Sequence, residues 1–215
     1  MNRNDERNQS QIIRKDARGC FVESKNDCFH LGKVHLGFAA YDLSREPGNR
    51  YTNNVNIYID IAEFMELTNE ALNGYLHTQM NNVKKHLADA KEPLYQSLGG
   101  TPASNLKEPR DDGMSQSRCV KLFVGEKRDY LLRAESGVGE TDAKGLIVPR
   151  YGNKPEQQVS VAMGWRDLTQ LLLMTKIHYE SWLTAQYLQK SNGNMDGKTD
   201  GSKDGKNVAD DTQMI

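Results

Sequence analysis

The chain has 215 residues, and its 28 Lys and Arg nearly balance 29 Asp and Glu, so the formal net charge is -1 at pH 7. With 37% hydrophobic residues it has enough apolar material for one ordinary domain or two small ones. The balanced charge excludes a general attraction to nucleic acid or to anionic membranes, so binding of either kind would require a local basic face.

Both ends of the chain are poor in residues that a core could bury. Residues 1–18 contain five Arg and Lys among Asn and Gln, which predicts a mobile basic arm. From residue 191 to 215, Gly, Asp, Lys and Asn recur without an apolar stripe, which predicts a disordered acidic tail. No apolar run has the length of a membrane span and only three cysteines are present, so we expect a cytoplasmic protein with no membrane partner.

The first half reads as strands followed by helices. Alternating apolar residues predict one long or two short strands over residues 28–42, and a second strand over Val55–Ile59. Asp60 and Glu63 have the spacing of a helix N-cap and capping box, and Gly74 should interrupt the helix that follows. Another helical pattern covers residues 78–90, and the Pro- and Gly-rich residues 91–117 read as a connector.

The second half repeats this order. Residues 118–137 predict two strands, residues 145–152 a third and residues 157–163 a fourth, before an amphipathic helix from Trp165 to about residue 187. Aligned without gaps, "VNIYIDIAEFMEL" (55–67) matches "VSVAMGWRDLTQL" (159–171) in its apolar positions.

These patterns together predict an α+β protein. We expect two tandem units of antiparallel sheet plus C-terminal helix, residues 19–90 and 118–190, related by a pseudo-twofold axis within one globular domain of residues 19–190. Two such units would pack their helices and inner strand faces together and leave the outer sheet faces free.

The outer faces carry cations mixed with aromatic side chains. Such a face can hold single-stranded nucleic acid, because cations contact phosphates and aromatic rings stack on bases. A solvated sheet face has a similar composition, so the residue types alone leave both readings open. The candidate binding residues, from strand alternation and adjacent loops, are Lys33, His35, Tyr41, Arg50, Tyr51, Tyr58, Lys121, Lys127, Arg133, Arg150 and Tyr151.

The passage "KGLIVPRYGNKPEQQ" followed by "VSVAMGWRDLTQLLLMTKIHYESWL" resembles the final strands and helix of single-stranded DNA-binding proteins of the Whirly and transcriptional positive-cofactor type. Their unit is a curved four-stranded sheet followed by a helix, and Whirly proteins carry it twice. The resemblance covers roughly residues 28–188 in plan, while the Lys-rich plant Whirly signature is missing. It implies DNA contacts from the sheet faces, in the second half from Lys121, Arg133 and also Lys144. The chain as a whole also resembles uncharacterised proteins of bacterial mobile elements.

Other chemistry finds little support in the sequence. Cys28, His30 and His35 are close in sequence, but on an extended strand Cys28 and His30 share one face and His35 takes the other, so we expect no metal site. The Gly-rich residues 136–145 lack the ending of a phosphate-binding loop, and no catalytic set is recognisable. We therefore expect neither enzyme nor cofactor.

The leading hypothesis is a single-stranded nucleic-acid-binding protein with little sequence specificity, for which we expect DNA rather than RNA. It would support replication, transfer or transcription of DNA. The alternative is a structural or adaptor module that uses the same surfaces for protein contacts, and either reading is compatible with a homo-oligomer.

Overall fold

The computed structural model of the chain describes residues 9–86 and 92–195. The chain divides into two compact units, Met1–Tyr179 and Glu180–Ile215. The first unit holds all the strands described below, and helix α4 (Trp165–Met195) continues from it into the second. The predicted tail lies largely outside the described residues, and its first part, residues 191–195, is helical.

Sheet A is an antiparallel meander in which consecutive strands pair in the order β1-β2-β3-β4. Its elements are β1 (Gln11–Ala17), β2 (Cys20–Lys25), the short 3-10 helix η1 (Phe29–Leu31), β3 (Lys33–Tyr41) and β4 (Tyr51–Asp60). Helix α2 (Ile61–Leu72) follows directly, and Gly74 with a φ of 82° separates it from α3 (Tyr75–Lys85). Left-handed backbone of this kind favours glycine, so the predicted interruption at Gly74 is confirmed.

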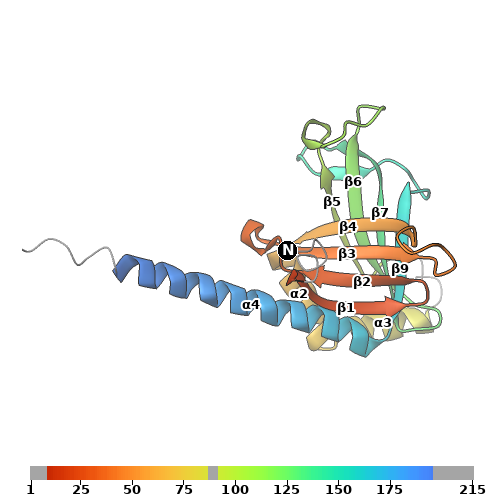
Figure 1. The fold of residues 1–215 in the computed structure, drawn as a ribbon. Helices are drawn as coiled ribbons and strands as arrows, with labels where there is room; N and C mark the ends of the chain where they lie inside the picture. The colour runs from red at the N-terminus through yellow and green to blue at the C-terminus, as the bar shows by residue number, and fades with distance from the viewer. Residues whose placement is uncertain (1–8, 87–91, 196–215) are drawn as a thin grey trace, which may run out of the picture. The chain divides into compact units, whose positions relative to one another are not determined.

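Sheet B follows the same plan, because β5, β6, β7 and β9 pair in sequence and the helix α4 comes directly after β9. Its elements are β5 (Tyr95–Thr101), the 3-10 helix η3 (Ala103–Asn105), β6 (Ser115–Val124), β7 (Tyr130–Thr141), the short β8 (Ile147–Pro149) and β9 (Gln157–Met163). The strands of the two sheets cross one another in Figure 1. The α+β class with two sheet-plus-helix units is therefore confirmed.

The core lies where strand alternation predicted it. Val55, Ile57 and Ile59 of β4 are buried, as are Val159 and Val161 of β9. Each strand places every second residue on the inner face, so the two strands that open the aligned stretches supply equivalent parts of the core.

Each sheet is covered in part by a helix from the other half of the chain. Ser24 on the inner face of β2 is hydrogen-bonded to Thr175 of α4, with 2.7 Å between the hydroxyl oxygens, and both residues are fully buried. In the opposite direction, Glu63 of α2 accepts hydrogen bonds from the Tyr95 hydroxyl at 2.9 Å and the Ser97 hydroxyl at 3.0 Å, both in β5. The two halves are therefore joined through their helices.

Two boundary predictions are wrong. Gln11–Ala17, expected within a mobile arm, form the edge strand β1, since pairing with β2 satisfies their main-chain groups. The expected connector of residues 91–117 contains β5, η3 and the start of β6. The expected capping box is also absent: Asp60 makes no side-chain cap, and it accepts instead a 2.8 Å bond from Lys33.

Candidate nucleic-acid interface

The outer face of sheet A is hollowed into a groove of about 630 Å³, which we call the sheet A groove. Strand register brings its residues together, because partners in an antiparallel pair share a face. Arg14, Glu23, Gly37 and Asn56 form one row across the four strands. The lining comprises Gln11, Arg14, Phe21, Glu23, Lys25, His35, Gly37, Phe38, Ala39, Tyr51, Asn54, Asn56 and Tyr58.

One end of the groove is an aromatic–arginine cluster centred on Phe21. The guanidinium carbon of Arg14 lies 3.5 Å from the Phe21 ring centroid, a cation–π contact. The rings of Tyr41 and Tyr51 each lie 6.3 Å from the Phe21 ring. Tyr51 is 62% exposed, so its ring is available to a ligand.

The cluster opens into a second hollow of about 410 Å³. Leu43, Pro47, Gly48 and Arg50, from the loop between β3 and β4, line this hollow together with the aromatic residues. Arg50 donates from Nε to the main-chain oxygen of Arg45 at 3.3 Å, and the rest of its guanidinium group is exposed. An apolar pocket edged by two arginines can take a planar ring and an attached phosphate together.

The other end of the groove is built by Tyr58 and His35. Their rings are stacked with centroids 4.7 Å apart, and Tyr58 is 43% exposed. Burial raises the pKa of Tyr58, with further contributions from Cys28 and Asp27. The Tyr58 phenol therefore stays neutral near pH 7 and offers a ring face and one hydroxyl donor.

The floor between the two ends is open because its residues are small. A Cβ atom at Gly37 would lie 3.4 Å from the Glu23 side chain and 3.5 Å from Lys25 Nζ, so a larger residue there would occupy the groove. Ala39 lies one pleat further toward the aromatic cluster.

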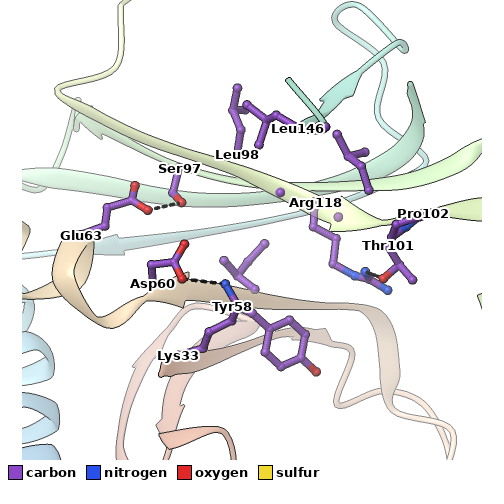
Figure 2. A pocket seen from close by; sticks show the side chains of 15 residues that line it. Lys33, Tyr58, Asp60, Glu63, Ser97, Leu98, Thr101, Pro102, Arg118 and Leu146 are labelled. Atoms are coloured by element: carbon purple, nitrogen blue, oxygen red, sulfur yellow. Dashed lines mark hydrogen bonds and ion pairs between the residues drawn. The ribbon is translucent and has the colours of Figure 1, made fainter. Parts of the chain in front are cut away.

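Tyr58 also lines a neighbouring cleft of about 330 Å³ between β4 and β5 (Figure 2). Lys33 is paired with Asp60 at 2.8 Å in this cleft, and Arg118 of β6 donates to the Thr101 hydroxyl at 2.6 Å. Figure 2 shows these pairs along the walls of the cleft. The cleft thus extends the sheet A groove to two further cations.

Most cations of the groove are paired with carboxylates. Arg14 lies 2.6 Å from Asp16, and Lys25 lies 2.8 Å from Glu23. The pair of Arg14 and Asp16 is partly exposed and contributes only up to about 1 kcal/mol because water screens it, whereas the side chains of Lys25 and Glu23 are only 22% and 16% exposed. A phosphate can therefore exchange with Asp16 at low cost, although the exchange lowers the affinity that Arg14 would give if it were unpaired.

The structure brings together the predicted residues of the first half. Tyr41, Arg50, Tyr51 and Tyr58 lie on the groove or its continuation, and Lys33 lies in the cleft. His35 differs from expectation: it is only 6% exposed, because the Tyr58 ring covers it.

The predicted residues of the second half lie elsewhere. Lys121 and Arg133 share the outer face of sheet B, where Lys121 pairs with Glu135 at 2.8 Å and Arg133 stacks on Phe123 at 4.8 Å. Tyr151 lies against Glu135 and Cys119, and burial raises its pKa. The three remaining candidates are exposed in loops or at a strand end, namely Lys127, Lys144 and Arg150, of which Arg150 pairs with Glu140.

Sequence reasoning missed Arg14, Phe21, Lys25 and Arg118. Arg14 lies in the segment expected to be a mobile arm, so its pairing with β2 and its contact with Phe21 do not follow from the sequence. The alternation in "QIIRKDA" (Gln11–Ala17) is the available signal, but the polar residues of this segment obscure it. Arg118 begins a predicted strand, and the sequence does not show that it lines a cleft.

Comparisons with protein-family models, with curated proteins and with solved structures found no match to this chain. Within residues 9–86 and 92–195, no helix is both long enough and apolar enough to cross a membrane. The function of the protein is therefore inferred from the residues of this chain.

Proposed function

We propose that the protein binds single-stranded nucleic acid, with little base specificity, through the sheet A groove. The observation that supports this proposal best is the aromatic–arginine cluster, in which Arg14, Phe21 and Tyr51 lie together at one end of a groove of about 630 Å³. Aromatic rings accept any base by stacking, so the cluster favours binding over sequence reading.

The arrangement gives a path for the strand. One base would stack on the exposed Tyr51, with Arg14 and Arg50 contacting its flanking phosphates. The strand would then cross the floor at Gly37, beside the side chains of Glu23 and Lys25, and reach Tyr58 at the other end. Lys33 and Arg118 in the adjoining cleft would contact the phosphates that follow.

A labelled oligothymidine, titrated at two salt concentrations and followed by fluorescence anisotropy, tests this proposal. We expect binding that weakens with salt, with a slope of log K against log[salt] of about -0.7 for each phosphate contact on single strands. Oligouridine of the same length tests the expected preference for DNA.

Matched charge variants test where the strand binds. Arg50→Gln should reduce the salt slope by about 0.7, whereas Lys127→Gln, which removes an exposed cation in the β6–β7 turn away from the groove and the cleft, should leave it unchanged. Absence of binding even at low salt would exclude the proposal and favour the adaptor function. Equal effects of both variants would exclude sheet A as the specific site.

A further inference from the structure

Three side chains with metal-binding groups lie together where β2 is connected to β3 in sheet A. Asp27, Cys28 and His35 place a carboxylate oxygen, Sγ and a ring nitrogen within 4.8 Å of one another. Asp27 and Cys28 lie in the loop after β2, and His35 is the third residue of β3. Sequence spacing pointed to His30 as a companion, but His30 is exposed on η1, and Asp27 takes its place in the cluster.

The loop that carries Cys28 is held firmly in place. The main-chain oxygen of Cys28 accepts hydrogen bonds from the amides of Leu31 at 3.0 Å and Lys33 at 3.2 Å. The next residue, Phe29, is buried and anchors η1. The ligand atoms are therefore brought together by a folded segment, which lowers the entropy that an ion would have to overcome on binding.

His35 faces an acceptor with each of its ring nitrogens. Nδ1 lies 3.0 Å from both carboxylate oxygens of Asp27, and Nε2 lies 2.9 Å from Asn56 Oδ1. Asp27 and Asn56 therefore hold the ring of His35 from its two sides. A cation between Nδ1 and Asp27 would leave Nε2–H to donate to Asn56.

We propose that Asp27, Cys28 and His35 bind one divalent transition-metal ion of the zinc type. Sulfur, nitrogen and oxygen ligands in one cluster are the donor set that zinc accepts, with bonds of about 2.0 to 2.3 Å. The separation of 3.0 Å between Nδ1 and the carboxylate fits two bonds of that length to one ion. The thiol would rotate toward the ion, leaving a fourth position for water.

The surroundings have the features that orient metal ligands. A ligating histidine usually donates its second N–H to a fixed acceptor, which is the role of Asn56 here. A cysteine binds a metal as the thiolate, so binding of the ion would release the proton of the Cys28 thiol.

Titration of Co²⁺ into the full-length, reduced, metal-free protein tests the site. We expect one Co²⁺ per chain with a thiolate-to-cobalt charge-transfer band, and displacement of the cobalt by Zn²⁺. The conservative variant Cys28→Ser should abolish the band, and Asn56→Ala should weaken binding by about 10- to 100-fold. His30→Ala is the matched control and should bind like the wild type.

Circular dichroism should show that the variants keep the wild-type secondary structure. If Cys28→Ser fails to fold, Asp27→Asn takes its place, since Asp27 is exposed and the change is isosteric. The proposal is overturned if the wild type gives no charge-transfer band, or if the band persists in Cys28→Ser. Where Cys28→Ser does not fold, the proposal is overturned if Asp27→Asn binds Co²⁺ like the wild type. A retained band would place the cobalt on Cys20 or Cys119.

Discussion

Replacement of Tyr51 by alanine separates binding from folding more cleanly than any other change to the sheet A groove. The ring is 62% exposed and touches the fold mainly through its edge-on contact with Phe21, 6.3 Å away. Such a contact contributes about 1 kcal/mol, so the variant should melt only about 2 to 4 °C below the wild type for a chain of this size.

The expected loss of binding free energy is larger than this loss of stability. Alanine substitution of a residue that stacks on a base costs about 1 to 3 kcal/mol, which corresponds to about 5-fold to about 150-fold in Kd. Anisotropy with labelled oligothymidine at low salt measures this change directly, and a thermal melt of the same sample measures the stability.

Tyr75→Ala provides the matched control, because Tyr75 is 51% exposed on helix α3 and does not line the groove. It should change the Kd by less than twofold. If Tyr51→Ala binds as tightly as Tyr75→Ala, Tyr51 does not stack on a base and the assignment of the aromatic–arginine cluster fails.

Three further predictions concern the fold. A Cβ at Gly100 would collide with a main-chain oxygen of β6, so Gly100→Ala should lower the free energy of unfolding in urea by about 1 to 3 kcal/mol. Gly99 has open space around it, so Gly99→Ala should leave the stability unchanged, and equal unfolding midpoints for the two variants would contradict this prediction. Thr175→Val should lower the free energy of unfolding in urea by about 1 to 3 kcal/mol, because the buried Ser24 hydroxyl loses its hydrogen-bond partner. An unchanged midpoint would show that the hydrogen bond between the halves contributes nothing to stability. Arg110 hydrogen-bonds Asp112 and Glu156 and lowers the pKa of both carboxyls, that of Asp112 to about 2, so this stabilisation is present at pH 6 and is lost as the pH falls to about 2. The stabilities of wild type and Arg110→Met should therefore differ at pH 6 and approach each other near pH 2, and a constant difference would refute the assignment.

The sequence was sufficient to predict the strands whose two faces differ in polarity. In β4 and β9, apolar residues alternate with polar ones, and each strand leads directly into a helix. The two-residue period of the strand and the order of strand and helix can therefore both be read from the sequence. The edge strands β1 and β5 were missed, since neither has a continuous apolar face and β5 contains two adjacent glycines. Local pattern is weak where pairing with a neighbour supplies most of the stability.

The candidate groove could be predicted only in part for the same reason. Tyr51 and Tyr58 were found because they lie on or next to a recognisable strand. The contact of Arg14 with Phe21 depends on the register between β1 and β2, and the meeting of Asp27 with His35 depends on the path of a loop. Neither arrangement leaves a spacing in the sequence that could be read without the fold.

The bond between Ser24 and Thr175 sets an order of events during synthesis. The two residues are 151 positions apart, so the inner face of sheet A lacks its α4 cover until nearly the whole first unit has been translated. At roughly 5 to 20 residues per second, the delay is on the order of 8 to 30 seconds. Once β4 has been made, the four strands of sheet A can pair, but part of their apolar inner face stays without its α4 cover, and the nascent chain should depend on chaperones until α4 has left the ribosome.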